Sequence, residues 1–299
     1  MIIIQLAGGL GNQLQQYALY RKFVRLGKEA RLDISWFTDS KKQEQVLAKR
    51  KLELDCFDRL LYEVCTKEEK EALTGSDGFT GKLRRRLLPG SVRTFLETDM
   101  YHPEIFELEN AYLTGYFACE KYYSDILYEL REKIQFPDSK NPLNIQLAAK
   151  MKECLSVSVH IRRGDYLDPA NAEMFGNICT TAYYDSAMEY VRQAYPAAHF
   201  YLFSDDPEYV RHHYQGGQYT VIDWNKGEDS FYDMWLMSRC KHNICANSTF
   251  SFWGARLNPH ADKMMIRPAL HKNSQIFEAE KMHDLWQKWV LIDRNGEVR

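Results

Sequence analysis

Residues 156–165 read Ser-Val-Ser-Val-His-Ile-Arg-Arg-Gly-Asp. The apolar side chains from Val157 to Ile161 fall on one face of this stretch, and His160 and Arg162 fall on the other. An alternation of this kind predicts a β-strand that ends just before the glycine. His160 and Arg162 would then lie together at the carboxyl end of a strand, which is the edge of an open α/β sheet where ligands bind.

Two interpretations of this strand end remain open from these ten residues alone. An arginine presents a rigid fork of N–H donors that suits an oxyanion such as a diphosphate. A structural Arg–Asp pair, with His160 as a satisfied core histidine, accounts for the same residues equally well. The other segments of the chain decide between the two.

Composition excludes several classes of protein. The chain has 299 residues, of which 45% are hydrophobic, and its net charge is −2, so it can bury two cores and has no bulk field for nucleic acid. Its seven cysteines form no CxxC and no zinc spacing, which predicts reduced thiols and no metal site. The first residues lack the pattern of a signal peptide or a membrane anchor. We expect a cytoplasmic protein, with peripheral association at the inner membrane face as a further expectation; nothing indicates a particular oligomeric state.

The first 35 residues predict a βαβ unit. A strand over Ile2–Leu6 precedes a glycine turn, a helix follows from about Asn12 to Leu26, and a second strand covers Ala30–Ile34. Gly9 lets a ligand approach the backbone closely at this turn. Side-chain amides such as those of Asn12 and Gln13 have the donors and acceptors that sugar hydroxyls require.

A dinucleotide site is the main alternative at the same turn. Gly9 and Gly11 fit the fingerprint, and Asp33 ends the second strand at a suitable distance. Leu14 stands where the third glycine belongs, so the fingerprint is incomplete. An NAD-dependent oxidoreductase is therefore one alternative function, and a non-catalytic galactoside-binding module is another.

Two prolines among polar residues make 136–142 the best linker, which predicts domains over residues 1–140 and 141–299. After it, strands and helices alternate again, with strands expected at His199–Phe203 and Tyr219–Asp223, and a last helix over Ile276–Trp289. The same alternation on both sides of the linker predicts two doubly wound α/β domains.

Two further strand ends carry polar side chains. Asp206 precedes Pro207 and is expected to cap a helix, which leaves Asp205 for a ligand. The segment Asn247-Ser248-Thr249-Phe250-Ser251-Phe252 follows a strand and leads into a short helix. Its hydroxyls and backbone N–H groups suit an anion, although a plain helix cap explains them as well.

Together these stretches resemble glycosyltransferase family 11 in its bacterial branch, the galactoside α-1,2-fucosyltransferases. The matching motifs are Gly8-Gly-Leu-Gly-Asn-Gln13, Val159-His-Ile-Arg-Arg-Gly-Asp-Tyr166, Tyr201-Leu-Phe-Ser-Asp-Asp206, the aromatic segment Gly115–Tyr123, and the run from Asp233 to Asn258. Gln15 departs from the family, which usually has phenylalanine there. The resemblance implies a GT-B fold, two Rossmann-like domains facing across a cleft. It also implies inverting transfer of fucose from GDP-β-L-fucose to the 2-hydroxyl of a terminal β-galactoside.

The resemblance also implies roles for individual residues. The C-terminal domain would bind the GDP-fucose donor through residues of the three strand ends: His160, Arg162, Arg163, Asp205, Asn247, Ser248, Thr249, Phe250, Ser251 and Phe252. The N-terminal domain would bind the galactose-terminated acceptor, with Gly9, Asn12, Gln13 and Glu120 as the expected contacts and residues 35–95 as the expected source of acceptor specificity.

The catalytic residues expected from this chemistry are Arg162 and Asp165. Because no DxD spacing occurs, we expect no metal and no other cofactor, with Arg162 stabilising the departing diphosphate in place of a cation. Asp165 leaves the same strand end and is the first choice for the base that deprotonates the acceptor hydroxyl. Holding Arg163 is an equally good role for Asp165, and Glu120 or a water relay through Asn12 or Gln13 are the rival bases.

Overall fold

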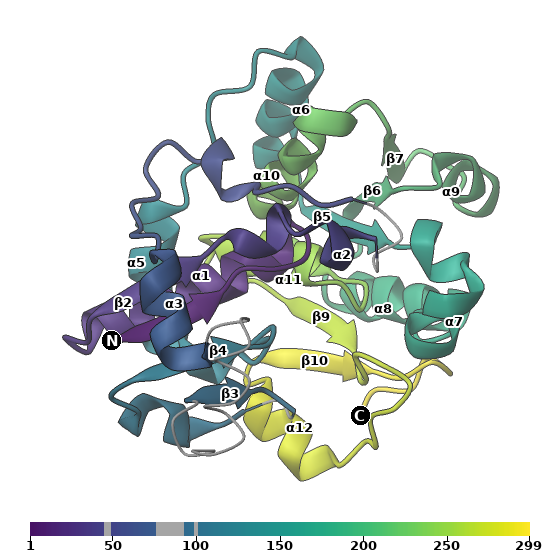
Figure 1. Cartoon of the computed structure of the whole chain (residues 1–299). Helices are drawn as coiled ribbons and strands as arrows, with labels where there is room; N and C mark the ends of the chain where they lie inside the picture. The colour runs from purple at the N-terminus through teal and green to yellow at the C-terminus, as the bar shows by residue number, and fades with distance from the viewer. Residues whose placement is uncertain (45–48, 76–92, 99–100) are drawn as a thin grey trace. The chain divides into compact units, whose positions relative to one another are not determined.

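The computed structural model describes residues 1–44, 49–75, 93–98 and 101–299 (Figure 1). The chain forms two compact units, Met1–Gln135 and Phe136–Arg299, compared with the predicted boundary after residue 140. Each unit is an α/β layer structure around its own parallel sheet, so the predicted fold class is confirmed for each unit by itself. The predicted arrangement of the two across a cleft stays a prediction.

Unit 1 contains a four-stranded parallel sheet in the order β2-β1-β4-β3. The strands are β1 (Ile2–Gln5), β2 (Ala30–Asp33), β3 (Thr94–Leu96) and β4 (Ala111–Thr114). As predicted, helix α1 (Leu10–Arg25) joins β1 to β2. Strand β1 is buried along its whole length because it has a strand on each side. Because β1 and β4 are adjacent and parallel, the loop after β1 and the loop after β4 lie next to each other at the carboxyl edge of the sheet.

The rest of unit 1 consists of short elements. They are α2 (Ser40–Gln43), α3 (Lys67–Thr74), α5 (Leu127–Lys133) and the 3-10 helices η1 (Ser35–Phe37), η2 (Leu54–Cys56), η4 (Pro103–Glu107), η5 (Glu120–Tyr122) and η6 (Ser124–Ile126). Strands β3 and β4 do not appear among the sequence predictions; each has four residues or fewer, β4 pairs with the distant β1, and β3 pairs with β4.

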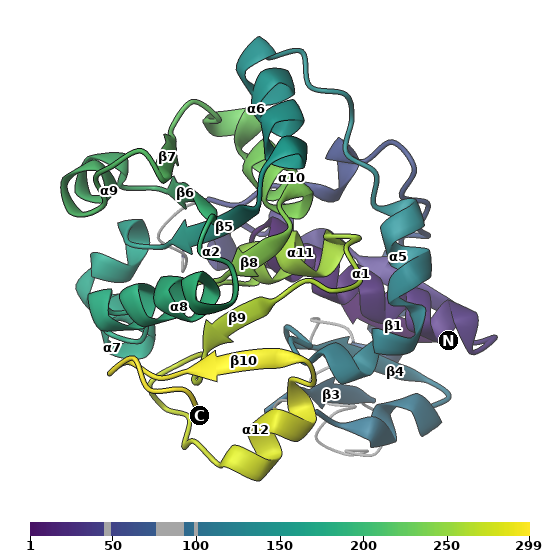
Figure 2. The same cartoon turned by 180° about the vertical axis from the view of Figure 1, so that it is seen from behind.

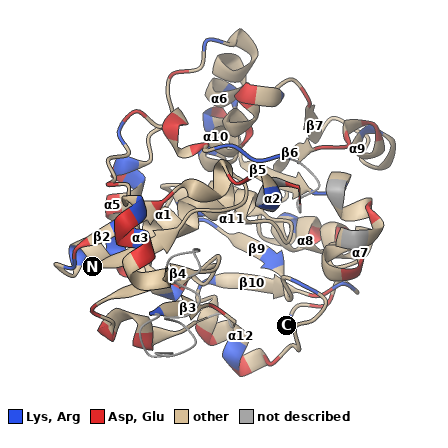
Figure 3. Ribbon diagram, viewed as in Figure 1, with Lys and Arg blue, Asp and Glu red and all other residues tan. Residues whose placement is uncertain are grey.

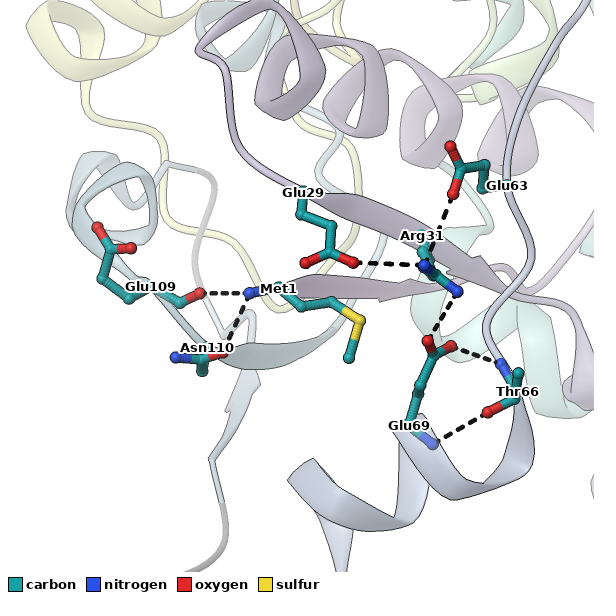
Figure 4. A network of polar contacts seen from close by, with 8 residues as sticks. All are labelled: Met1, Glu29, Arg31, Glu63, Thr66, Glu69, Glu109 and Asn110. Carbon is teal, nitrogen blue, oxygen red and sulfur yellow. Dashed lines mark hydrogen bonds and ion pairs between the residues drawn. The ribbon is translucent and has the colours of Figure 1, made fainter.

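Polar contacts attach α3 to the sheet of unit 1 (Figure 4). Arg31 on β2 lies 2.7 Å from a carboxylate oxygen of Glu69 and 3.3 Å from one of Glu29. Glu69 also accepts a hydrogen bond from the backbone N–H of Thr66, whose hydroxyl caps α3 in return. Both signs of charge alternate along α3, as Figure 3 shows. The carboxylates of Glu29, Glu63 and Glu69 all serve Arg31 or the start of α3, so these contacts are structural.

Unit 2 contains a six-stranded parallel sheet in the order β10-β9-β8-β5-β6-β7. The strands are β5 (Ser156–Ile161), β6 (His199–Ser204), β7 (Tyr219–Ile222), β8 (His242–Ile244), β9 (Met265–Pro268) and β10 (Trp289–Ile292). From β5 the chain adds β6 and β7 toward one edge of the sheet. It then returns to the other side of β5, where β8, β9 and β10 follow toward the opposite edge. The two directions part between β5 and β8, and this topological switch point is where open α/β sheets bind ligands.

Helices cover both faces of this sheet (Figures 1 and 2). Val157 and Val159 share a buried cluster with α8 (Thr181–Ala194) on one face, whereas Tyr201 and Phe203 pack with α6 and α10 on the other. Along β6, Phe200 and Leu202 belong to the first core and Tyr201 and Phe203 to the second, so alternate side chains of this strand face the two cores. The remaining elements are α6 (Pro142–Glu153), α7 (Pro169–Phe175), α9 (Pro207–His213), α10 (Phe231–Arg239), α11 (Thr249–Leu257), α12 (Ala279–Leu285), η7 (Gly164–Leu167) and η8 (Gly227–Ser230).

Two of the sequence predictions at the C-terminal end are wrong. The expected helix over Ile276–Trp289 is only α12, and Trp289 begins strand β10, which pairs with β9. The short helix after the polar segment, which the sequence predicts over Phe252–Leu257, begins three residues earlier, at Thr249, so α11 includes part of the predicted polar loop. This second difference moves the first helical N–H groups into the candidate site.

Candidate functional site at the switch point of unit 2

Strand β5 delivers His160 and Arg162 to the carboxyl edge of the sheet. Only 7% of His160 is exposed, its ring lies against the Phe250 ring with 5.8 Å between centroids, and its Nδ1 atom has no hydrogen-bond partner. Burial, followed by the charge of Arg162, lowers the pKa of His160 to about 3. His160 is therefore neutral at physiological pH, with a buried ring nitrogen that can serve a ligand or a water.

Asp205, at the end of the neighbouring strand β6, orients the arginine. Its Oδ2 lies 2.7 Å from Nη1 of Arg162, and its Oδ1 accepts a 2.9 Å hydrogen bond from the Arg163 backbone. A side chain at Gly164 would put its Cβ 2.4 Å from Oδ2 of Asp205, so the glycine is required for this close approach. Both oxygens of Asp205 thus hold the β5 loop, and its predicted contact with the donor stays a prediction.

Arg163 has a separate partner. Its Nε donates to Oδ2 of Asp206 over 3.0 Å, and its guanidinium lies 3.5 Å from the centre of the Tyr209 ring. Asp206 also caps α9 by accepting from the Tyr209 backbone, which confirms the predicted cap. Arg163 therefore anchors α9 to the β5 loop, and its predicted contact with the donor stays a prediction.

The loop after β8 divides into buried and accessible residues. Asn247, Ser251 and Phe252 are at most 2% exposed, so the prediction that they face the donor needs correction. The Asn247 amide donates to two backbone carbonyls, those of Phe175 and His271. The accessible members are Ser248, Thr249 and Phe250, which begin α11.

The start of α11 can bind an anion. Ser248 occupies the N-cap position but makes no side-chain capping hydrogen bond. The first N–H groups of any α-helix lack an intrahelical acceptor, and the helix dipole adds positive potential there. Since β8 pairs directly with β5, these N–H groups and Arg162 lie on the two sides of the same switch point.

Tyr166 joins the two loops, and its role was not foreseen from the sequence. Its hydroxyl donates to the Asn247 carbonyl over 3.0 Å, and its ring stacks on Phe175 with 5.2 Å between centroids. The Arg162 guanidinium lies 5.7 Å from the centre of the same ring. Tyr166 thus fixes the distance between the arginine loop and α11. Asp165, the predicted base, lies between Arg162 and Tyr166 in the sequence, and its side chain is outside the described residues.

Behind α11, aromatic rings surround buried arginines. Arg256 and Arg267 have no exposed surface, and the Arg267 guanidinium lies 3.7 Å from the centre of the Trp286 ring and 4.6 Å from that of Phe252. Burial and Arg267 lower the pKa of the neighbouring His271 to about 3. Phe252 therefore belongs to this packed layer rather than to the ligand-facing surface.

Asp233 is a further acid at this edge of unit 2. It lies in the first turns of α10, which follows β7, and it accepts a 2.8 Å hydrogen bond from the Asn225 side chain. Burial raises the pKa of its carboxyl group to about 7, and the Asn225 hydrogen bond opposes this shift. Asp233 begins one of the family-like motifs, the run from Asp233 to Asn258, but no pattern in the sequence indicated that its side chain is buried. Within the described part of the chain, no cluster of three or more His, Cys, Asp or Glu could hold a metal ion.

In unit 1, the predicted acceptor contacts separate into accessible and buried residues. Gly9 and Asn12 are partly exposed at the start of α1, whereas Gln13 has no exposed surface. The Gln13 amide is used on backbone groups: it donates to Gly8 and Lys51 and accepts from Glu53. The predicted role of Gln13 in binding a sugar is therefore corrected to a scaffold role. Glu120 is partly exposed and lies within electrostatic reach of Arg131 on α5.

The acid of the dinucleotide alternative is also a structural residue. Asp33 is 2% exposed, lies 2.8 Å from the Lys70 ammonium, and accepts hydrogen bonds from the Tyr112 hydroxyl and the Ser35 backbone. Burial would raise the pKa of Asp33, but these partners together lower it below its ordinary value. A carboxylate so enclosed cannot reach a ribose, which removes the main support for an NAD site.

Known proteins are similar to this chain over most of its length. The sequence model described as "Glycosyl transferase family 11" matches residues 102–293. The alpha-1,2-colitosyltransferase of Escherichia coli is 29% identical, with 98% of this chain and 99% of that protein covered. The Escherichia coli O-antigen biosynthesis glycosyltransferase WbnK is 31% identical, with coverages of 88% and 92%.

Among solved structures, POFUT1 in complex with GDP is similar over 87% of this chain and 94% of its own, at 13% identity and a TM-score of 0.41. The fold assignment above therefore rests on the strand order of each unit.

Proposed function

The chain belongs to glycosyl transferase family 11, and from this premise we propose that it transfers L-fucose from GDP-β-L-fucose to the 2-hydroxyl of a terminal β-galactoside. The product carries an α-1,2 linkage, so the configuration at the transferred carbon is inverted. The name of the Escherichia coli alpha-1,2-colitosyltransferase supports α-1,2 transfer, and a galactoside alpha-(1,2)-fucosyltransferase 1 of Saimiri boliviensis boliviensis is 32% identical over 34% of this chain. No observation on this chain favours the oxidoreductase or the non-catalytic module.

One observation carries the proposal: Arg162 and the first turn of α11 meet at the β5–β8 switch point, joined by Tyr166. Negative charge grows on the β-phosphate as the sugar departs. A guanidinium aimed by Asp205 and a row of helix N–H groups supply fixed donors for this charge. The neutral His160 beside them can hydrogen-bond the nucleoside without adding a further charge.

We further propose that these donors replace a metal ion, so that turnover does not require a divalent cation. The Arg162 guanidinium and the first N–H groups of α11 would together neutralise the charge of a diphosphate without a bridging cation. Treatment with EDTA should leave the rate unchanged. A rate that falls on chelation and recovers with Mg²⁺ or Mn²⁺ would contradict this part of the proposal.

The experiment that tests the function combines binding with product analysis. GDP should raise the melting temperature and NAD should not, because ligand binding to the folded state stabilises it. The protein is then incubated with GDP-fucose, or with nucleotide-activated colitose, and a panel of β-galactosides. NMR of the product should show an α-1,2 linkage to galactose. Exclusive transfer of colitose would correct the donor, and no transfer from either donor would refute the proposal.

A cytoplasmic location with peripheral association at the inner membrane face belongs to the same proposal. No helix in the described ranges is long and apolar enough to cross a membrane. In unit 1, Leu26 is 47% exposed beside Arg25, and Leu61 is 78% exposed close to Arg59. Apolar side chains next to cations favour the surface of an anionic bilayer. Co-sedimentation with anionic but not with neutral vesicles is expected, and equal behaviour with both would contradict the association.

A further inference from the structure

Unit 1 has a topological switch point of its own. Its sheet is all parallel, and the strand order β2-β1-β4-β3 places the loops after β1 and β4 next to each other at the carboxyl edge. Gln16 ties these loops together: its Oε1 accepts from the Ala7 backbone, and its Nε2 donates to the Gly115 carbonyl. Gly9, Asn12 and the 53% exposed Tyr116 surround this point and are accessible. The position is where an open α/β sheet binds a ligand.

A carboxylate and a guanidinium lie against this turn. A Cβ built on Gly9 would lie 3.5 Å from Nη1 of Arg50 and 3.9 Å from Oε2 of Glu53. Both groups come from a segment that passes over the start of α1. The Gln13 amide holds that segment in place, donating to the Lys51 carbonyl over 2.9 Å and accepting from the Glu53 backbone over 2.8 Å. Gly9 and Glu53 are both partly exposed, so the carboxylate lies beside an accessible part of the turn.

We propose that Glu53 is the base that takes the proton from the acceptor's 2-hydroxyl group, and that Arg50 positions its carboxylate. This assignment rests on the proposed transfer reaction. The galactose oxygen forms a bond to the anomeric carbon of fucose while the bond from that carbon to the β-phosphate oxygen breaks. The electron pair of the broken bond leaves with GDP, the hydroxyl proton goes to the Glu53 carboxylate, and solvent later removes it.

The surroundings of Glu53 suit a base. Burial raises the pKa of Glu53 above its ordinary value, and the charges of Arg50 and Lys51 and the Leu10 amide hydrogen bond oppose the shift. The Cys56 thiol is a titratable neighbour on the same segment, and burial and Glu53 raise its pKa to about 12, so it stays neutral. A carboxylate whose pKa is raised accepts a proton more readily, which is the property a general base needs.

The other acids proposed for this role have different surroundings. Glu120 is within reach of Arg131 on α5, and the Asp165 side chain is outside the described residues. A structural role for Glu53 is the competing explanation. The N-cap residue Gly9 has no side chain, α1 has no acid in its first turn, and Glu53 accepts from the Leu10 amide. Glu53 could thus stabilise the helix without taking part in chemistry, and the two roles predict different measurements.

Glu53→Gln separates the two roles because it keeps the size of the side chain and an oxygen for the Leu10 amide but cannot take a proton. We expect kcat to fall by about 100- to 10,000-fold, while the Kd for GDP, the KM for the acceptor and the melting temperature change little. Glu63→Gln is the matched control, since Glu63 is an exposed acid of the same unit. Glu53→Asp keeps a carboxylate on a shorter stem and should retain part of the activity.

The pH profile supplies a readout that a structural role would not move. In the wild type, kcat/KM should fall on the acid side as Glu53 becomes protonated, and this limb should be missing from the residual activity of Glu53→Gln. Retention of more than a tenth of kcat by Glu53→Gln would overturn the assignment. A loss of kcat that comes with a lower melting temperature in both Glu53 variants would overturn it in favour of the helix cap. A wild-type protein that transfers no sugar would refute the proposed function, and this inference with it.

Discussion

The two units hold their loops at the carboxyl edge by different balances of neutral amides and charged side chains. In unit 1, three neutral amides of α1 bond the loop backbones: Gln13, Gln15 and Gln16 are at most 1% exposed. In unit 2, the corresponding loops are held by the ion pairs Arg162–Asp205 and Arg163–Asp206. The loops of unit 1 are thus held mainly by neutral amides, with the Glu97 carboxylate accepting from the Tyr116 and Phe117 backbones, whereas ion pairs hold the loops of unit 2.

The difference follows the ligands that each unit is proposed to bind. Ion pairs whose side chains are 25–33% exposed contribute little to stability, so the pairs in unit 2 mainly orient guanidinium groups. A diphosphate needs such groups. A neutral sugar does not, and buried amides that already bond the backbone give a rigid surface that neither titrates nor responds to salt. At the turn of unit 1, Arg50 and Glu53 are the charged groups that lie against Gly9 among the described residues.

The largest expected effect is on kcat, and it follows from changing the shape of the Arg162 side chain in unit 2 while its charge is kept. Arg162→Lys keeps the positive charge but loses the planar fork that Asp205 aims. We expect kcat to fall by about 100- to 1,000-fold, which is the cost of removing a preorganised donor from a developing oxyanion. Steady-state kinetics with saturating acceptor measure this, and isothermal titration gives the Kd for GDP.

The matched control is Arg211→Lys, because Arg211 is a 44% exposed arginine of the same unit that pairs with Asp223. Its kinetics should equal those of the wild type. Turnover close to wild type in Arg162→Lys would show that charge alone suffices, and the contrast between the two units would lose its functional meaning.

The second effect concerns the neutral scaffold of unit 1. Gln13→Leu has nearly the same volume but removes three hydrogen bonds to buried or partly buried backbone groups. We expect a loss of about 2–3 kcal/mol in the free energy of unfolding, measured by urea denaturation. Because no charge changes, this loss should be the same at low and high salt.

The control for this variant is Gln146→Leu. Gln146 is an exposed residue of α6, so this substitution should change the free energy of unfolding little. A destabilisation by Gln13→Leu that grows or shrinks with ionic strength would contradict a purely neutral scaffold. The variant should also lower kcat, because the backbone of Glu53 loses its support.

Local patterns in the sequence predicted much of unit 2. The alternation in β5, the helix cap at Asp206 and the strand–helix order each depend on residues adjacent in the chain. Strand β4 depends on pairing with β1, where Ala111 lies opposite Ile2, and β3 depends in turn on pairing with β4, so no local period reveals either strand. Trp289–Ile292 is a short apolar run that a helix or a strand explains equally well, and only its pairing with β9 decides.

The candidate site was predicted by residue type but not by burial. Gln13 and Asn247 carry amides, and an amide suits a sugar hydroxyl and a backbone carbonyl equally well. Tertiary packing uses both amides on backbone groups. Glu53 lies in an irregular segment without any motif, and its position follows only from the Gln13 contacts that bring it to Gly9.

The smallest effect tests Asp233, an acid of unit 2 whose pKa is controlled by burial rather than by an ion pair. The pKa of Asp233 is raised to about 7 from an ordinary value near 3.8. A raised acid pKa means that the folded state binds more protons than the unfolded state between these values. The stabilisation from neutral Asp233 is therefore complete below about pH 4 and is lost as the pH rises toward 7.

Asp233→Asn keeps an acceptor for the Asn225 amide and cannot ionise. It should be more stable than the wild type above pH 7, by on the order of 1–2 kcal/mol, and equal to it near pH 4. Melting curves at several pH values measure this, with Asp229→Asn at an exposed position beside α10 as the control. A stability difference that does not depend on pH would mean that Asp233 stays charged in the folded protein, and that unit 2 relies on charge there as well.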